Sequence, residues 1–357
     1  MFPSSTKLAL ASLALGLLLS QRGGGGGGGG VAAMKLEGGD PMGVKAYDLY
    51  GGRNASILQY PADFNRGTFP LPVHCHNCYE TSGSAFYGAL AYGARSLESD
   101  VWLNPADKEL YVGHDPFSLT RERTFDALTV QPLVEVLEQA NRANIAQSDG
   151  DEARFFAELQ RSLKTPQTFP VNGYFSLGVG STAPIQLLVD IKTDGATTWP
   201  YVVRALEPLR KRGWLTRYED GKLIPGPVLV IGTGNTPIDQ VAPLRRRDVF
   251  FDGPLGNLSA PLVIDGTRYE WNSTLSPLAS GSFSKIVGSY KGLDEPSAEV
   301  LANISRPIDE AHARGIQTRY WDSPQWPVFA RNRINHLMLS AGSDWIGSDD
   351  LEHISKW

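Results

Sequence analysis

Residues 185–192 read Ile-Gln-Leu-Leu-Val-Asp-Ile-Lys, an apolar run that ends in a carboxylate and a lysine. Residues 94–103, Ala-Arg-Ser-Leu-Glu-Ser-Asp-Val-Trp-Leu, place two more carboxylates in a second such run. Apolar runs of this length are typical of buried strands. The parallel strands of an α/β barrel bring their carboxyl ends together at one face. The two stretches therefore favour a barrel with a charged mouth.

The alternation of strand and helix continues along the chain from about residue 46. We expect strands at 71–75, 94–103, 110–113, 185–191, 228–232, 249–252, 285–290, 316–321 and 345–348, and helices at 84–92, 133–143, 199–212, 298–315 and 329–342. Counting 110–113 as a short return on the second unit leaves eight strand positions, which predicts one α/β domain over 46–357, a TIM-type (β/α)8 barrel. A doubly wound sheet is the alternative, but no G-x-G-x-x-G follows the first strand.

The stretch from 144 to 182 interrupts this alternation. It is mostly polar and later rich in Pro, Gly and Ser. We expect it to form an insertion or lid between the second helix and the third strand.

The amino terminus differs in composition from the barrel. Lys7 precedes an apolar run over 8–19, and eight glycines follow at 23–30. This pattern predicts a signal peptide over 1–22 and a Gly-rich flexible segment over 23–45. A membrane anchor is the alternative, but it needs roughly 18 apolar residues.

Other sequence features agree with a secretory route. Four Asn-x-Ser/Thr sequons would accept N-glycans on surface loops, at Asn54, Asn257, Asn272 and Asn303. We expect a protein that is secreted or resides in the secretory lumen, with membrane-surface association left open. The formal net charge of −5 argues against nonspecific nucleic-acid binding.

Carboxylates mark two of the expected strands as a metal site. Glu98 and Asp100 are two residues apart, so their side chains point to the same side of an extended strand. Asp190 supplies a third carboxylate from the next long strand. Three carboxylates suit one hard divalent cation, Mg²⁺ or Ca²⁺, better than zinc.

Two histidines and a lysine stand near these carboxylates. His76 and His114 each directly follow an apolar strand, where an imidazole can give or take a proton near neutral pH. Lys192 lies two residues after Asp190, so it would point into the same mouth and neutralise a phosphate oxygen. His74 is expected to be structural, and Asp115 a turn residue.

The only cysteines of the chain, Cys75 and Cys78, bracket His76 in a C-x-x-C. Two thiols are too few ligands for a metal site, and a thioredoxin-type motif should open a helix early in a βαβ unit. We favour a structural role, either a local disulfide or two semi-buried thiols, over a redox role.

Several motifs in this order resemble the PLC-like phosphodiesterase superfamily, which includes glycerophosphodiester phosphodiesterases, phosphatidylinositol-specific phospholipases C and sphingomyelinase D toxins. More closely, they resemble the fungal altered inheritance of mitochondria protein 6 family. The matching segments are 73–77 (Val-His-Cys-His-Asn), 96–103, 111–114, 188–195, 230–237, 319–322 (Arg-Tyr-Trp-Asp) and 348–351.

The resemblance implies a TIM-type barrel and a metal-dependent phosphoric diester hydrolase. By position it implies His76 and His114 as the acid–base pair, Glu98, Asp100 and Asp190 as metal ligands, and Lys192 as a phosphate contact. It also implies that Trp321 lines the substrate pocket, where we include Asn77. The expected substrate is a phosphodiester, such as a phospholipid headgroup or a glycerophosphodiester.

One departure from the pattern concerns the substrate. Glycerophosphodiester phosphodiesterases usually follow the first histidine with Arg-Gly, whereas Asn77 and Cys78 stand here. A noncatalytic barrel that binds phosphorylated lipid or sugar headgroups is therefore the alternative. A glycosidase would explain the carboxylates but neither Lys192 nor the histidine pair.

Overall fold

The structure is a computed structural model, and it describes residues 68–81, 85–141, 151–163, 171–175 and 183–356. The predicted signal peptide, the Gly-rich segment and the sequon at Asn54 lie outside these residues. Two helices of the predicted scheme, α3 (Ala85–Ala91) and α4 (Gln131–Ala140), form close to their expected positions.

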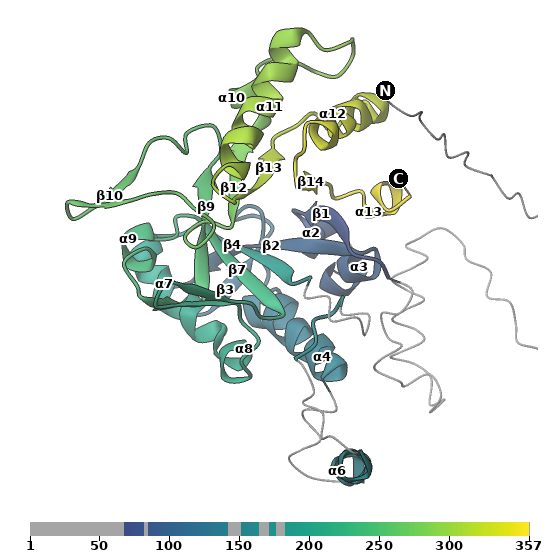
Figure 1. The fold of residues 1–357 in the computed structure, drawn as a ribbon, viewed down its shortest axis with the longest axis vertical. Helices are drawn as coiled ribbons and strands as arrows, with labels where there is room; N and C mark the ends of the chain where they lie inside the picture. Colours follow the sequence, from purple (N-terminus) through teal and green to yellow (C-terminus); the bar gives the residue numbers. More distant parts are fainter. Residues whose placement is uncertain (1–67, 82–84, 142–150, 164–170, 176–182, 357) are drawn as a thin grey trace, which may run out of the picture. The chain divides into compact units, whose positions relative to one another are not determined.

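Eight parallel strands close into a barrel, which confirms the predicted fold class (Figure 1). Each strand pairs with the next, and β1 closes the ring by pairing with both β14 and β2. In barrel order the strands are β1 (Leu71–Cys75), β2 (Ala94–Leu103), β4 (Ile185–Ile191), β7 (Val228–Gly234), β9 (Val249–Pro254), β12 (Leu278–Ser282), β13 (Gln317–Trp321) and β14 (Trp345–Gly347). The short β3 (Leu110–Val112) pairs antiparallel with the end of β2, as its reading as a return strand predicts.

Helices between the strands and short hairpins complete the described part. The other helices are α2 (Cys78–Thr81), the π-helix η3 (Asp126–Val130), α6 (Asp151–Ser162), α7 (Gly195–Ala205), α8 (Glu207–Lys211), α9 (Ile238–Val241), α10 (Phe283–Val287), α11 (Ala298–His312), α12 (Val328–Ser340) and α13 (Leu351–Ile354). The minor strands are β5 (Arg217–Glu219), β6 (Lys222–Ile224), β8 (Arg246–Arg247), β10 (Leu262–Ile264) and β11 (Thr267–Tyr269). In the described part of the chain, no helix combines the length and apolar character needed to cross a membrane.

The sixth barrel strand is not where the sequence predicted it. Instead of 285–290, the strand is Leu278–Ser282, and residues 283–287 form α10. Ser282 caps this helix, because its side chain accepts the backbone N–H of Lys285. The strand contains only one large apolar residue, so its composition hides it from a hydrophobicity pattern. Packing leaves little room at one of its small residues, since a Cβ at Gly281 would lie 3.1 Å from Leu255 Cβ and 3.2 Å from the Leu255 carbonyl oxygen.

The region expected as an insertion contains more order than its composition suggests. Its described residues include the twelve-residue helix α6. They also include Tyr174 and Phe175, which are buried and pack edge-to-face with ring centroids 4.8 Å apart.

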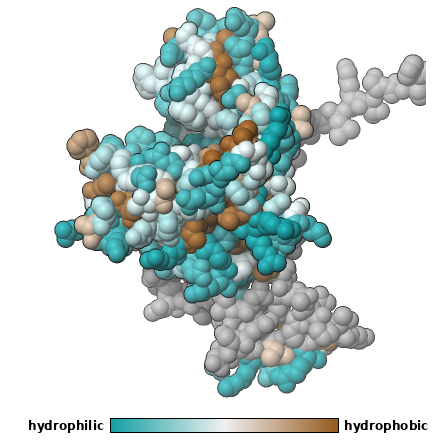
Figure 2. All heavy atoms as spheres, turned by 90° about the vertical axis from the view of Figure 1, so that its left-hand side faces the viewer, coloured by the Kyte–Doolittle hydropathy of each residue, from teal (hydrophilic) through white to brown (hydrophobic). Residues whose placement is uncertain are grey.

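Apolar side chains gather inside the barrel and around it. A cluster inside the barrel consists of Leu188, Ile231, Phe250, Leu278 and Trp345, and we call it the floor. A larger cluster packs the outer faces of the strands against the helices, as expected when both faces of a parallel sheet are covered. Figure 2 shows that apolar residues on the side of β10 and α9 occur in small groups among hydrophilic ones.

Candidate active site

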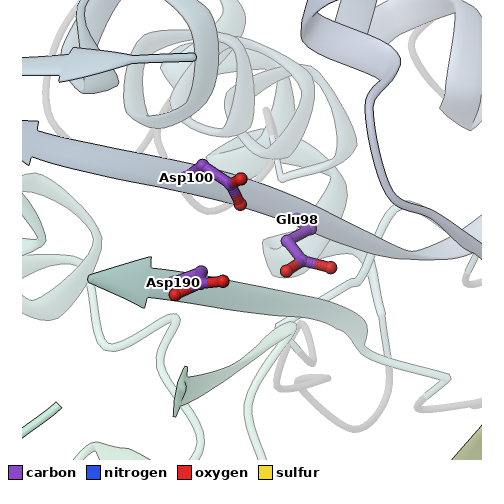
Figure 3. Close-up of side chains that lie close together, drawn as sticks. All are labelled: Glu98, Asp100 and Asp190. Carbon is purple, nitrogen blue, oxygen red and sulfur yellow. The ribbon is translucent and has the colours of Figure 1, made fainter. Parts of the chain in front are cut away.

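Three carboxylates converge at the carboxyl ends of β2 and β4, the face of the barrel that we call the mouth (Figure 3). The parallel register sets Asp100 directly opposite Asp190, and Glu98 precedes Asp100 by two residues on the same strand. One oxygen of each carboxylate lies within 4.8 Å of the others. The structure therefore brings together the three predicted ligands in a space the size of a cation site.

Glu98 is held by two buried side chains from other strands. His74 Nε2 lies 2.8 Å from Glu98 Oε2, and Arg319 Nη2 donates to the same oxygen at 3.2 Å. Burial alone would raise the pKa of Glu98, but Arg319 and the His74 hydrogen bond lower it below its usual range. Burial lowers the pKa of His74 to about 4. His74 is therefore a neutral residue that orients Glu98, which is a structural role.

Lys192 lies between the other two carboxylates. Its Nζ donates to Asp190 Oδ2 at 2.6 Å and lies 3.0 Å from Asp100 Oδ2. Burial raises the pKa of Asp100 to about 7, with Glu98 adding to the effect and Lys192 opposing it. Burial also raises the pKa of Asp190. Removal from water thus disfavours the charged form of both aspartates, and a cation bound beside them would favour it.

His76 is held in the mouth by a carboxylate from the last strand's loop. Asp349 Oδ1 accepts the backbone N–H groups of His76 and Asn77 at 3.0 and 2.8 Å. Asp349 Oδ2 lies 3.8 Å from His76 Nδ1. Burial by itself would lower the pKa of His76, but Asp349 and the charge of Glu98 raise it above its usual value. Asp349 therefore fixes both the loop and the charge of this imidazole.

His114 faces His76 from the loop after β3. The two rings lie 5.2 Å apart between centroids at an interplanar angle of 74°. His114 Nδ1 lies 3.5 Å from Asp100 Oδ2, and its backbone N–H donates to Glu80 Oε1 at 2.8 Å. The structure thus brings the two predicted histidines face to face, with His114 beside Asp100.

A disulfide joins Cys75 to Cys78 beneath the His76 loop. Cys78 begins α2, the short helix that also carries Glu80, the partner of the His114 backbone. The disulfide thus fixes a helix that contacts both histidine loops. This geometry matches the structural role that we expect for the cysteines.

The carboxylate cluster fits a hard divalent cation. Neither side-chain oxygen of the buried Asp100 accepts a well-formed hydrogen bond, although Lys192 lies close to one of them. A buried carboxylate that lacks well-formed hydrogen bonds is costly. Oxygen atoms from three carboxylates are the ligand set that Mg²⁺ and Ca²⁺ prefer.

The remaining predicted residues lie in varied positions. Asn77 Oδ1 accepts the hydroxyl of Tyr79, so its carbonyl is engaged inside the loop, and Trp321 at the end of β13 is 45% exposed. Asp115 Oδ1 accepts two backbone N–H groups of its own turn, those of Phe117 and Ser118. Among the sequons, Asn257 is exposed and Asn272 is half-buried in a loop. Asn303 lies inside α11, so the expectation that every sequon occupies a loop is wrong at this position.

Sequence reasoning missed the roles of Arg319, Asp349 and Glu80. The first two stand in matching motifs, but no local pattern marks them as partners of Glu98 and His76. The contacts span 221 and 273 residues. Only the closure of the barrel brings these side chains together.

A phosphodiesterase-type TIM barrel is the class that this fold and mouth define, with carboxylates, two histidines and a lysine at the strand ends. Residues 62–252 match the family described as the AIM6-like phosphodiesterase domain. An altered inheritance of mitochondria protein 6 homolog from Arthroderma benhamiae is 35% identical over 304 residues, covering 83% of this chain and 86% of that protein. Altered inheritance of mitochondria protein 6 from Saccharomyces cerevisiae is 31% identical over 307 residues, covering 81% and 71%. The chain therefore belongs to the AIM6-like phosphodiesterase domain family.

A solved structure is also similar to the chain. The crystal structure of a glycerophosphodiester phosphodiesterase from Parabacteroides distasonis matches with a TM-score of 0.40 and 12% identity, over 80% of this chain and 98% of that one.

Proposed function

We propose that this protein is a metal-dependent phosphoric diester hydrolase that uses His76 and His114 as its acid–base pair. The observation that carries the proposal is the pairing of two facing imidazoles with three converging carboxylates. A protein that only binds a headgroup has no need of two titratable rings beside a cation site. We further propose that the protein enters the secretory pathway, where the Cys75–Cys78 disulfide is stable.

The two imidazoles divide the proton transfers between them. One takes the proton from the attacking hydroxyl, which is either water or a neighbouring group of the substrate, and the other gives a proton to the leaving oxygen. Asp349 stabilises the protonated form of His76, and Asp100 lies beside His114. Both rings are partly exposed, so each can reach a substrate in the mouth.

The charges around the carboxylates position the phosphate. Glu98, Asp100 and Asp190 would hold the cation, and Lys192 would contact a phosphate oxygen. When bound, Mg²⁺ or Ca²⁺ supplies Lewis-acid stabilisation of the phosphate charge. Arg319 and His74 keep Glu98 ionised and oriented for this purpose.

Hydrolysis of bis(4-nitrophenyl) phosphate tests the proposal. We expect EDTA to abolish the rate and Mg²⁺ or Ca²⁺ to restore it. His76→Ala and His114→Ala should each lower kcat by about 10²–10⁴-fold, because each removes one proton transfer.

The matched control is His312→Ala, since His312 is a surface residue at the end of α11 whose Nε2 pairs with Asp344. This variant should keep its rate. Rates in both mouth variants within about threefold of the wild type would overturn the acid–base assignment and favour the headgroup-binding alternative.

A further inference from the structure

Exposed aromatic side chains stand in the loops at the mouth, and apart from Trp321, the predicted pocket residue, the catalytic assignment uses none of them. Among the large apolar residues that the structure describes, Phe117 and Trp326 are the two most exposed, at 96% and 79%. Phe117 lies three residues after His114, and Trp326 lies in the loop after β13. Phe329, at 59%, stands in the first turn of α12. We call Phe117, Trp321, Trp326 and Phe329 the aromatic rim.

The rim residues belong to one face of the barrel. Phe117 follows His114, whose ring lies 3.5 Å from Asp100 at the end of β2. The other three follow the carboxyl end of β13. Between these two sites, in barrel order, stand β1 and β14, whose loops carry His76 and Asp349. The exposed rings therefore stand in the two loop regions that flank the loops of β1 and β14.

The turn that presents Phe117 is ordered by its own hydrogen bonds. Asp115 Oδ1 accepts the backbone N–H of Phe117 at 2.7 Å, and Ser118 Oγ donates to the carbonyl of Asp115 at 2.9 Å. The ring is thus held away from the protein by a structured turn instead of folding back onto it. Such exposure of a Phe side chain costs free energy in water, and burial against an apolar partner recovers it.

We propose that the aromatic rim docks the mouth onto the surface of a zwitterionic phospholipid bilayer. The inference rests on the proposed function, and of the expected substrates it takes those that lie in an extended surface. Nucleic acids and phospholipid bilayers are the extended surfaces of that kind. Exposed Trp and Phe rings suit the headgroup boundary of a bilayer, where an apolar ring is buried and a polar edge stays wet.

The charge of the protein favours a zwitterionic bilayer over nucleic acid or an anionic membrane. The chain has a formal net charge of −5, which opposes a polyanion such as nucleic acid or a strongly anionic membrane. The loop that carries Phe117 is balanced, with Asp115 and Glu122 against Arg121 and Arg123. The loop that carries Trp326 adds only Asp322. A nearly neutral rim with aromatic side chains fits a neutral, zwitterionic surface.

Co-sedimentation with phosphatidylcholine vesicles tests the docking surface. The wild type should bind, and Phe117→Ala combined with Trp326→Ala should weaken the partition by at least about tenfold. A second variant, Phe117→Ala with Phe329→Ala, keeps the segment before α12 unchanged and should also weaken binding.

The matched control is Phe69→Ala. Phe69 is 69% exposed but precedes the amino end of β1, on the opposite face of the barrel, so this variant should bind like the wild type. Absence of wild-type binding, equal binding by the rim variants, an equal loss in Phe69→Ala, or binding to anionic vesicles alone would each overturn the proposal.

Hydrolysis of soluble bis(4-nitrophenyl) phosphate separates this inference from the proposed function. The rim variants should keep the wild-type rate on this substrate, because the rings that they remove are largely exposed and have no part in the catalytic assignment. Vesicle binding without any hydrolysis by the wild type would contradict the hydrolase assignment and leave the docking surface supported. Hydrolysis without vesicle binding would support the hydrolase assignment and overturn the docking surface.

Discussion

The floor and the mouth of the barrel interior lie only two residues apart along the same strands. On β4, Leu188 packs in the floor and Asp190 lies in the mouth. On β9, Phe250 packs in the floor and Asp252 follows two residues later. Because side chains two apart on a strand face the same side, both members of each pair point into the barrel. The same interior thus changes from apolar packing to charge within one strand repeat.

The floor therefore contributes mainly to the stability of the fold, and the mouth holds the candidate catalytic groups. The floor gains free energy from buried apolar area. The mouth buries charges, which is favourable only when each has a partner. Arg319 pairs with Glu98, and Lys192 with Asp190. Charge pairing in the mouth holds the candidate catalytic groups in place, and the packed floor holds the strands that carry them.

The largest expected contrast comes from substituting neighbours on β4. Leu188→Ala removes a fully buried side chain and should lower the free energy of unfolding by about 3 kcal/mol, with specific activity kept. Asp190→Asn should lower the rate of diester hydrolysis by at least about 100-fold, with a much smaller change in stability. Urea denaturation and the hydrolysis rate, measured on both variants, check that one variant loses stability and the other loses activity. Similar losses of both quantities in both variants would remove the distinction between floor and mouth.

A second contrast concerns the buried ion pair. Glu98→Gln leaves the guanidinium of Arg319, itself only 5% exposed, without its countercharge. We expect a loss of about 3 kcal/mol in the free energy of unfolding. Glu98→Gln combined with Arg319→Met should recover part of that loss, because no unpaired charge remains. A double variant less stable than Glu98→Gln alone would show that Arg319 contributes mainly by packing.

Removing the carboxylate of Asp252 should stabilise the folded protein, unlike the substitutions above. Burial raises the pKa of Asp252 from 3.8 to about 7, so its charged form is disfavoured in the folded protein. Ionisation therefore costs stability increasingly as pH rises from about 4 to 7, by ~1.4 kcal/mol per unit at most. Asp252→Asn should raise the melting temperature at pH 8 and make little difference near pH 4. A stabilisation independent of pH would contradict this reading of Asp252.

The smallest expected effect concerns the pH profile of the histidine pair. Asp349 helps to raise the pKa of His76, so Asp349→Asn should lower that pKa. The limb of the kcat/KM profile that belongs to His76 should then move to lower pH. Asp350→Asn is the control, because the Asp350 carboxylate pairs with Arg331 instead. A shift of equal size in the control, or no shift in Asp349→Asn, would show that the contact between Asp349 and His76 does not set the pH profile.

Much of this arrangement can be predicted from sequence because it depends on local repeats. The apolar run before Asp190 and the two-residue spacing of Glu98 and Asp100 predict both a strand and a shared side. The carboxyl ends of the barrel strands meet at one face, so His76 after β1 also falls into place, whereas His114 is brought there by β3, which returns antiparallel along the end of β2. These predictions need the period of a strand and the count of units, and the sequence contains both.

The parts that could not be predicted depend on packing between distant segments. Strand β12 lacks the apolar pattern, and its Gly281 packs closely against Leu255 and Ile286, which are distant along the sequence or outside the strand. The partnership of Arg319 with Glu98 requires the register of strands that stand on different sides of the ring. Such contacts follow from closure of the barrel, which no single segment of sequence specifies.

Calorimetric titration with Mg²⁺ and with Ca²⁺ measures whether the carboxylates of the mouth form a cation site. The wild type should bind one cation, and Asp190→Asn should weaken its affinity by about 10–100-fold or more. Asp115→Asn is the matched control, because Asp115 stands beside His114 yet bonds only within its own turn, and it should bind like the wild type. No binding by the wild type, or equal affinity in Asp190→Asn, would show that these carboxylates do not form a cation site.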